Sequence, residues 1–276
     1  MSPCAKILKQ LQRWTAGWFV CVLACGGVSG QQNKIRVAAA ADLKFAMVEL
    51  AQKFEEQGGA KAEVTYGSSG NFSSQMQNGA PFDVFFSADV DYPRRLAAAG
   101  VAEPGTMYEY AIGRIVIWAP PDAKVDVARD GWRALLDARV QKIAIANPQH
   151  APYGRAAMAA MQKAGIYEQV KTKLVYGENI SQAAQFVQSG SAQAGIVALS
   201  LAVSPGMKDG ESWVVPAEMH PPIEQAAIVL RAAQNKSGAT AFLEFVASAK
   251  GREILARFGF RAADAGAAQR KEPEKK

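Results

Sequence analysis

The sequence is poor in the residues that hold metals and disulfides. Its three cysteines, Cys4, Cys21 and Cys25, all lie near the N-terminus, and its only histidines are His150 and His220. A chain that loses this N-terminal segment has no cysteine, which excludes disulfides and thiolate metal sites. Two histidines so far apart in the sequence do not indicate a metal centre either. We therefore expect no metal cofactor, and we expect the size of the core to supply the stability.

The sequence also lacks a long apolar run and a strong excess of one charge. Of its 276 residues, 49% are hydrophobic and 20% are charged, as in ordinary globular proteins. The net charge of +6 falls to +3 after residue 30, where 28 of the 31 basic residues face all 25 acidic ones. Such a balance gives no basic footprint for nucleic acid. No segment after residue 30 is long and apolar enough to suggest a membrane span.

Motifs for catalysis and for nucleotide binding are absent as well. No Gly-x-x-x-x-Gly-Lys-Ser/Thr or Gly-x-Gly-x-x-Gly sequence occurs, which removes the common phosphate and dinucleotide loops. The run Gly67-Ser68-Ser69-Gly70 differs from the Gly-x-Ser-x-Gly elbow of hydrolases, and no base lies near it in the sequence. Asp83 and Asp89 are better explained as a strand-end cap and a turn residue than as paired catalytic carboxylates. We expect no enzymatic activity.

The N-terminal residues have the pattern of a secretory signal. Three basic residues, the last of them Arg13, precede an apolar stretch over residues 16–24, and small residues follow up to Gly30. We predict a signal peptide over residues 1–30, with cleavage near its end and export to the periplasm. A lipoprotein signal that leaves a lipid anchor at Cys25 is the alternative, although the residue two places before this cysteine is not small.

Beyond the signal, short apolar runs alternate with amphipathic helices, which is typical of parallel sheets flanked by helices. The rhythm stops near residue 111 and restarts at residue 112. The elements after residue 223 have no unit of their own to complete, so we assign them to the first unit. The predicted strands are 35–40, 62–66, 84–86, 112–119, 143–146, 196–199 and 223–230, and the predicted helices are 43–54, 72–77, 132–136, 155–164, 239–249 and 252–258.

These units predict an α/β protein with two lobes, each a mostly parallel sheet flanked by helices. Lobe 1 comprises residues 31–111 and 224–262, lobe 2 comprises residues 112–223, and residues 263–276 form a flexible tail. The chain would then cross between the lobes twice and form a hinge. Because open α/β sheets bind ligands at the carboxyl ends of their strands, we expect a ligand cleft between the lobes.

Three predicted strand-to-helix junctions are rich in hydrogen-bond donors. They are Ala39-Ala40-Ala41-Asp42, then Tyr66-Gly67-Ser68-Ser69-Gly70-Asn71, and the segment over residues 147–154. A helix start presents unpaired N–H groups and the positive end of the helix dipole, so several starts that converge hold an anion without a cationic side chain. Each junction alone is typical of an ordinary helix cap. Together they favour a binding site for a small anion.

The first two junctions, and the segment over residues 79–89, together resemble one known family, the molybdate-binding proteins of ABC importers. The resemblance rests on Ala39-Ala40-Ala41-Asp42-Leu43, on Gly67-Ser68-Ser69-Gly70 and on Gly79-Ala80-Pro81-Phe82-Asp83-Val84-Phe85-Phe86-Ser87-Ala88-Asp89, and it extends from about residue 34 to residue 260. It implies a type II periplasmic binding fold and a solute-binding protein that captures molybdate or tungstate. The implied partners are this oxyanion and the membrane permease of the importer. The protein itself is expected to be a monomer without a cofactor.

Position by position, the resemblance implies that backbone amides and hydroxyls hold the oxyanion at five residues: Ala41, Asp42, Ser69, Tyr153 and Ile180. Ser69 matches the serine of the family's second junction, which contributes both its hydroxyl and its N–H. Ile180 matches a position that contributes a backbone N–H at a helix start. At the position of Tyr153 many members have a small residue and others a tyrosine.

Two positions depart from the pattern of the family. Asp42 stands where a hydroxyl or amide side chain is common, and a carboxylate that faces a dianion repels it. We therefore expect the Asp42 side chain to turn away and cap its own helix at the N–H of Phe45, which leaves only its backbone amide for the ligand. Ala198 stands where some members carry a ligand tyrosine. We expect the Tyr153 hydroxyl to replace that group from the other side.

Two alternatives remain open. The first is the same fold with another ligand, such as phosphate, sulfate or a ferric ion. Iron calls for clustered tyrosine, histidine or carboxylate ligands, whereas uncharged donors around Ser69 suit an anion. The second alternative is an enzyme on a similar two-lobed frame. It needs a base and a nucleophile within reach of each other, and the sequence indicates neither.

Overall fold

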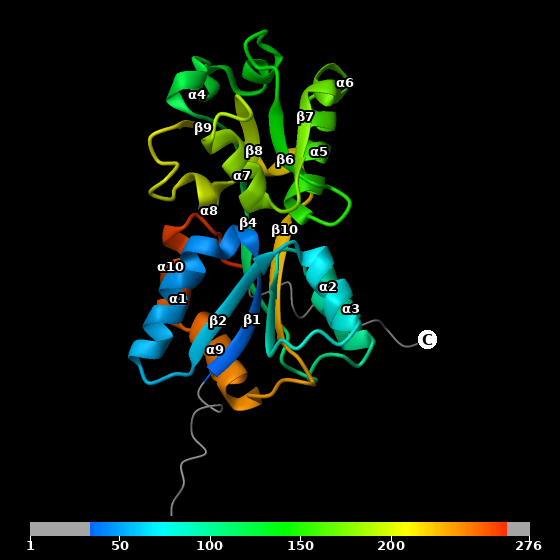
Figure 1. Ribbon diagram of the computed structural model, residues 1–276, viewed down its shortest axis with the longest axis vertical. Helices are drawn as coiled ribbons and strands as arrows, with labels where there is room; N and C mark the ends of the chain where they lie inside the picture. The colour runs from blue at the N-terminus through cyan, green and yellow to red at the C-terminus, as the bar shows by residue number, and fades with distance from the viewer. Residues whose placement is uncertain (1–33, 264–276) are drawn as a thin grey trace, which may run out of the picture. The chain divides into compact units, whose positions relative to one another are not determined.

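The computed structural model describes residues 34–263, all of which belong to one compact unit, Gln32–Lys276. The predicted signal peptide and the predicted tail from residue 264 onward lie outside the described residues. The structure contains two five-stranded sheets (Figure 1). No helix within the described range has the length and apolar character of a membrane span.

The first sheet has the strand order β2-β1-β3-β10-β4. Strands β1, β2 and β3 run parallel, whereas β10 is antiparallel to both β3 and β4. The bounds of these strands are β1 (Lys34–Ala40), β2 (Lys61–Gly67), β3 (Val84–Ser87), β4 (Tyr108–Gly113) and β10 (Ile223–Val229).

The second sheet repeats this arrangement with the order β7-β6-β8-β5-β9. Strands β6, β7 and β8 are parallel, and β5 is antiparallel to its two neighbours. The bounds are β5 (Ile115–Ala119), β6 (Ile143–Ala146), β7 (Leu174–Gly177), β8 (Ala194–Ala198) and β9 (Glu211–Val214). Each sheet is therefore mixed, with a parallel half and an antiparallel half.

Helices cover both faces of the first sheet, with α1, α9 and α10 on one side and α2 and α3 on the other (Figure 1). Residues of β1 alternate between the two cores: Ile35 and Val37 pack with the α1 side, and Ala38 packs with Phe72 of α2. These helices are α1 (Lys44–Glu56), α2 (Ser69–Gln77), α3 (Asp91–Ala98), α9 (Lys236–Ala247) and α10 (Ala249–Arg257).

The second sheet packs its apolar strands against shorter helices in a single large core. They are α4 (Val127–Asp130), α5 (Pro152–Lys163), α6 (Tyr167–Val170), α7 (Ile180–Gln188) and α8 (Leu199–Ala202). Five 3₁₀ turns complete the elements of the described chain: η1 (Ala41–Leu43), η2 (Pro121–Ala123), η3 (Gly131–Leu136), η4 (Lys171–Lys173) and η5 (Ala217–Met219).

The chain passes from the first sheet to the second at Arg114 and returns between β9 and β10. This corrects the predicted strand over residues 112–119. It is two strands, β4 and β5, which belong to different sheets, because apolar residues on both sides of Arg114 hide the boundary in the sequence. The predicted lobe boundaries stay a prediction.

Candidate functional site

The first two strands of the first sheet end side by side. β1 pairs with β2 so that Ala40 lies opposite Gly67. η1 follows β1 directly, and α2 begins at Ser69, with only Ser68 between it and the end of β2. Gly67 permits the close packing at this edge, because a Cβ there would lie 2.9 Å from the ring of Phe72. Two helical starts therefore meet at one edge of the sheet.

The second sheet repeats this geometry with β6 and β7. Ala146 lies opposite Gly177 at their ends, and α5 and α7 follow at Pro152 and Ile180. At Gly154, in the first turn of α5, a Cβ would lie only 2.1 Å from the carbonyl oxygen of Ala146. Only glycine lets the start of α5 approach the end of β6 so closely.

These four junctions line one small pocket. All five residues that the resemblance implied as ligands are in its wall, which consists of Ala40, Ala41, Asp42, Gly67, Ser68, Ser69, Ala88, Ala151, Pro152, Tyr153, Asn179 and Ile180. The wall contains no lysine, arginine or histidine. The pocket has a volume of about 10 Å³, which is about the space that one water molecule needs. In this arrangement it is therefore too small for a larger ligand.

Ser69 is placed to donate a hydrogen bond into the pocket. Its side chain is fully buried, and its Oγ accepts the N–H of Ala88 at 2.9 Å. A hydroxyl has one proton and two acceptor sites, so the Ser69 proton stays available. As the first residue of α2, Ser69 also has a backbone N–H without an acceptor inside its helix.

The second sheet offers backbone amides at the pocket. Tyr153 is the second residue of α5 and Ile180 is the first of α7, so neither N–H has a partner within its helix. The Oδ1 of Asn179 accepts the N–H groups of Ser181 and Gln182, each at 3.0 Å. This cap satisfies the next two amides of α7 and leaves the N–H of Ile180 toward the pocket.

The expectation that Asp42 caps its own helix is wrong. Neither η1 nor α1 has a side-chain cap at its start. Instead, Oδ2 of Asp42 accepts the hydroxyl of Tyr153 at 2.9 Å and the Nε2 amide of Gln225 at 2.7 Å. The prediction failed because these partners lie 111 and 183 residues away in the sequence. Local capping rules carry no information about such partners.

The Asp42 carboxyl is buried and only partly satisfied. Its exposed fraction is 1%, and its Oδ1 has no hydrogen-bond partner among the described residues. Burial raises the pKa of Asp42 to about 6, against the opposing effect of the hydrogen bonds from Gln225 and Tyr153 and of the nearby N–H groups of Asp42 and Leu43. A carboxyl that changes its charge near neutral pH therefore forms part of the pocket wall.

The Tyr153 hydroxyl is already engaged in this arrangement. It donates its single proton to Asp42, and it accepts Nε2 of Gln225 at 3.0 Å. The Oε1 of Gln225 in turn accepts the hydroxyl of Tyr110 at 2.7 Å, which fixes the orientation of the amide. The expected role of this hydroxyl in place of a tyrosine at Ala198 stays a prediction. A role for Tyr153 as a ligand through its N–H stays a prediction.

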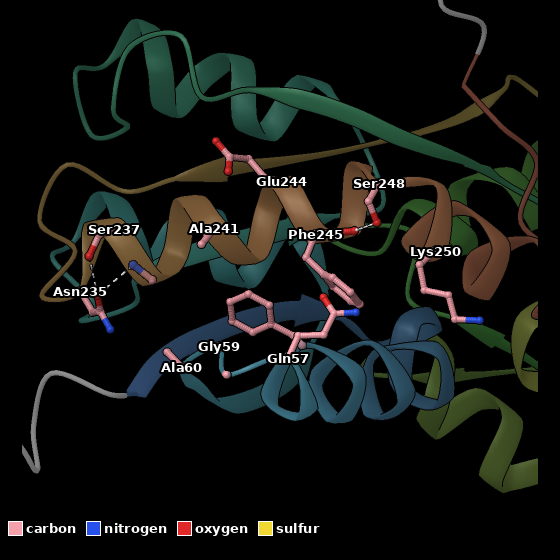
Figure 2. Close-up of a pocket in the computed structure, with 13 residues that line it drawn as sticks. Gln57, Gly59, Ala60, Asn235, Ser237, Ala241, Glu244, Phe245, Ser248 and Lys250 are labelled. Atoms are coloured by element: carbon pink, nitrogen blue, oxygen red, sulfur yellow. Dashed lines mark hydrogen bonds between the residues drawn. The ribbon is translucent and has the colours of Figure 1, made fainter.

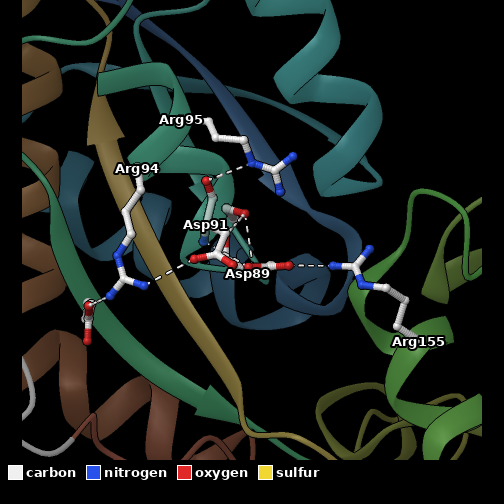
Figure 3. Close-up of polar contacts among 7 residues, drawn as sticks. Asp89, Asp91, Arg94, Arg95 and Arg155 are labelled. Atoms are coloured by element: carbon white, nitrogen blue, oxygen red, sulfur yellow. Dashed lines mark hydrogen bonds and ion pairs between the residues drawn. The ribbon is translucent and has the colours of Figure 1, made fainter. Parts of the chain in front are cut away.

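Further polar contacts at and beside the pocket join segments that follow strands of the two sheets. The Nδ1 atom of His150 lies 3.0 Å from Oγ of Ser68, and the carbonyl of His150 accepts the N–H of Gly70 at 3.0 Å. Figure 3 shows Asp89 directed toward Arg155, with which it forms an ion pair at 2.5 Å. This pair lies in the wall of a cavity of about 500 Å³. Because Arg155 pairs with Asp89, its positive charge is neutralised there.

Sequence reasoning missed Gln225 and Arg155 as parts of this region, whereas His150 lies in the third junction predicted from the sequence. Gln225 is fully buried in β10, and a glutamine within an apolar strand was the available signal, since a buried amide needs partners. The turn role predicted for Asp89 is confirmed, because its Oδ1 accepts the N–H of Asp91 at 2.9 Å. Nothing in the local sequence indicated its second role as the partner of Arg155.

A larger groove of about 680 Å³ lies between α1 and α9 (Figure 2). The start of α9, in the wall of this groove, is already capped, because Oδ1 of Asn235 accepts the N–H of Gly238 at 2.9 Å. Glu244 and Lys250 lie in its wall. Because the start of α10 in this wall is capped as well, with Oγ of Ser248 accepting the N–H of Gly251 at 3.2 Å, the groove offers fewer free backbone donors than the small pocket and is the weaker candidate.

A family model described as "Bacterial extracellular solute-binding protein" matches residues 35–261, a range that includes both sheets except for the first residue of β1. The chain belongs to this family. Open α/β sheets bind ligands at the carboxyl ends of their strands, and the small pocket lies at such strand ends in both sheets.

Two relatives of this chain are molybdate-binding proteins by name. Molybdate-binding protein ModA of Rhodobacter capsulatus is 37% identical over 228 residues, which cover 83% of this chain and 88% of that protein. The ModA protein of Azotobacter vinelandii is also 37% identical, over 240 residues that cover 87% of this chain and 93% of that protein.

A solved structure with the name of a molybdate-binding protein is also similar to this chain. The periplasmic molybdate-binding protein of Azotobacter vinelandii matches with a TM-score of 0.78 and 32% identity, covering 83% of this chain and 99% of that chain. The resemblance predicted from the sequence motifs and the predicted two-lobed α/β fold are thereby confirmed.

Proposed function

We propose that this protein captures molybdate outside the cytoplasm and delivers it to the membrane permease of an ABC importer. The observation that carries the proposal is the convergence of helix starts from both sheets on one pocket whose wall contains no basic side chain. Uncharged donors hold a dianion by many short hydrogen bonds, without the strong ion pair that would slow its release. The names of the relatives supply the identity of the anion.

The donors that we assign to the anion come from both sheets. The first sheet contributes the hydroxyl and N–H of Ser69 and the backbone of Ala41 and Asp42, and the second contributes the N–H groups of Tyr153 and Ile180. The pocket must widen to admit a tetrahedral oxyanion, since its volume is now about 10 Å³. A ligand that bridges both sheets stabilises the closed arrangement, which is the state a permease recognises.

Tungstate has the same charge and shape as molybdate, so we expect it to bind at the same donors. Sulfate and phosphate are smaller oxyanions and are the alternatives. Donors spaced for the longer bonds of molybdate do not all reach a smaller ion, which disfavours sulfate. Phosphate carries a proton near neutral pH and needs an acceptor in the site, so it is the sharper competitor.

The proposed location is the periplasm, reached by the signal peptide predicted over residues 1–30. Anchoring through a lipid at Cys25 is the alternative to release by cleavage near Gly30. We propose a monomer, because the proposed function needs a protein that diffuses between the solute and the permease. These assignments rest on the sequence pattern and on the family.

A thermal-shift series with four anions tests the proposed function. Residues 31–276 are heated alone and with molybdate, tungstate, sulfate or phosphate at equal concentrations. A ligand at about 1,000 times its Kd stabilises the folded state by about 4 kcal/mol, which raises Tm by several degrees in a chain of this size. We expect large shifts with molybdate and tungstate only. A larger shift with phosphate or sulfate would reject molybdate as the physiological ligand.

A further inference from the structure

The Asp42 carboxylate conflicts with the chemistry of a dianion site. It lies in the wall of the small pocket, and its side chain is buried. A negative charge there repels a dianion, and burial leaves little solvent to screen the repulsion. Yet its side chain is held in place by two partners, Tyr153 and Gln225, so it does not turn away. The conflict disappears if the carboxyl is neutral when the anion is bound.

The hydrogen bonds show which oxygen takes the proton. Oδ2 accepts both the Tyr153 hydroxyl and Nε2 of Gln225, and the Gln225 amide is oriented by its own bond to Tyr110. A proton on Oδ2 would have to displace these donors. Oδ1 has no partner among the described residues. A proton therefore binds at Oδ1, where the resulting O–H needs an acceptor.

The groups that face Asp42 do not supply a competing charge. Tyr153 from α5 and Tyr110 from β4 are neutral, because burial raises the pKa of each well above its ordinary value. The helices α7 and α8, which also contact η1, carry no charged residue. The other elements packed around Asp42 do carry charged residues. They include Lys44 of α1, Arg155 of α5, which pairs with Asp89, Glu109 of β4, which pairs with Arg94, and Glu224 of β10.

We propose that Asp42 is a specificity-determining residue that couples binding of the dianion to the uptake of one proton. As the anion enters, the carboxylate takes a proton from solvent at Oδ1, and the new O–H donates a hydrogen bond to an oxygen of the anion. This inference rests on the proposed function, because it requires an oxyanion in the small pocket. Protonation turns the Asp42 carboxylate, which repels the dianion, into one more hydrogen-bond donor.

The coupling fixes the direction of the pH dependence. In the free protein the pKa of Asp42 is about 6, and a bound dianion raises it further. The observed affinity is therefore highest below pH 6 and falls as pH rises, by about tenfold per pH unit once the free carboxyl is ionised. Asparagine has the same shape and carries donor protons permanently, so Asp42→Asn mimics the protonated state at every pH.

The experiment is calorimetric titration of molybdate into residues 31–276 between pH 6 and 8.5. At pH 8 the titration is repeated in buffers with different ionisation enthalpies, because the dependence of the heat on the buffer counts the protons taken up. The wild type, Asp42→Asn and Asp91→Asn are compared. Asp91 is an exposed carboxylate that pairs with Arg94, so its substitution controls for the loss of a surface charge.

We expect the wild type and Asp91→Asn to take up about one proton at pH 8 and to lose about tenfold in affinity per pH unit above pH 7. Asp42→Asn should take up none and should keep one Kd across the range. The buffer series on the wild type needs no variant, so misfolding of Asp42→Asn would not remove the test.

Each other result overturns the proposal. Molybdate that binds tightly without proton uptake refutes the coupling and leaves the proposed function intact. Proton uptake that persists in Asp42→Asn assigns the proton to another group. If molybdate does not bind at any pH in this range, the proposed function fails and the coupling fails with it.

Discussion

The two sheets share one strand order but furnish the candidate site with different chemistry. At the ends of β1 and β2 the pocket wall includes polar side chains, namely the hydroxyl of Ser69 and the carboxyl of Asp42. At the ends of β6 and β7 the donors that we assign to the anion are the backbone amides of Tyr153 and Ile180. The first sheet thus offers groups that a substitution can remove or recharge, whereas the second offers groups fixed by the fold.

This difference has an energetic consequence. A backbone amide at a helix start is neutral at every physiological pH, so its burial carries no cost of ionisation. The Asp42 carboxyl is costly when ionised, because burial disfavours the charged form. We expect the first sheet to set the pH response and selectivity of the site, and the second to set its geometry.

The largest expected effect concerns the stability of the first sheet. The folded pKa of Asp42, about 6, is raised above the unfolded value of 3.8, so its stabilising contribution is complete below pH 3.8 and is lost as pH rises through 6. A difference of about two pH units corresponds to about 3 kcal/mol. Without ligand, Asp42→Asn should therefore be more stable than the wild type at pH 7, by up to this amount.

Urea denaturation of both proteins at pH 5 and pH 7 measures this effect. The advantage of Asp42→Asn should grow with pH between these values, while the exposed-site variant Asp91→Asn should follow the wild type. An advantage that is equal at both pH values would mean that the ionisation of Asp42 does not cost stability.

The second effect separates the side-chain donor from the amides. Ser69→Ala removes a hydrogen bond to a charged ligand, which is worth about 1.5–3 kcal/mol or a tenfold to hundredfold loss of affinity. Ser74→Ala changes an exposed serine of the same helix and should bind molybdate as the wild type does. Calorimetry at one pH compares the three proteins, and an unchanged Kd in Ser69→Ala would remove this hydroxyl from the site.

The third effect tests the amides of the second sheet through their cap. Asn179→Ala removes the acceptor for the Ser181 and Gln182 amides and should cost about 1 kcal/mol of stability. Asn179→Asp keeps the cap but adds a negative charge to the pocket wall. We expect it to retain the stability and to bind molybdate more weakly.

Denaturation and calorimetry on these two variants give opposite rankings if the account is right. Asn179→Asp should exceed Asn179→Ala in stability, and its affinity should be the lower of the two. Equal affinities would show that Asn179 does not face the anion.

The smallest expected effect on affinity is that of Tyr153→Phe. The hydroxyl already donates its proton to Asp42, so its removal should change the affinity by less than the tenfold expected for Ser69→Ala, while the backbone N–H stays in place. A Kd that rises as much as in Ser69→Ala would show that the hydroxyl moves to the anion on binding.

Local sequence patterns predicted the parts of the structure that depend on neighbours in the chain. The strand over residues 143–146 has the predicted bounds, and the helix start at Ser69 lies within the predicted second junction. The apolar run over residues 112–119 was misjudged because periodicity does not show when a strand leaves one sheet for another. Short elements with little apolar character, such as β9, gave no signal.

The same limit applies to the candidate site. The position of Ser69 followed from a glycine-flanked junction that is visible in the sequence. The environment of Asp42 depends on Tyr153 and Gln225, which folding brings from the second sheet and from the returning strand β10. The resemblance placed Asp42 in the site, but only the three-dimensional contacts show that its carboxyl stays there.

The most direct test of the central claim is to locate molybdenum in crystals of residues 31–276 grown with molybdate, by anomalous diffraction at the molybdenum absorption edge. We expect one strong anomalous peak between the start of α2 and the starts of α5 and α7. The oxygens of the oxyanion around this peak should lie within hydrogen-bonding distance of Ser69. A peak in the groove between α1 and α9, or the absence of a peak between the two sheets, would contradict the account.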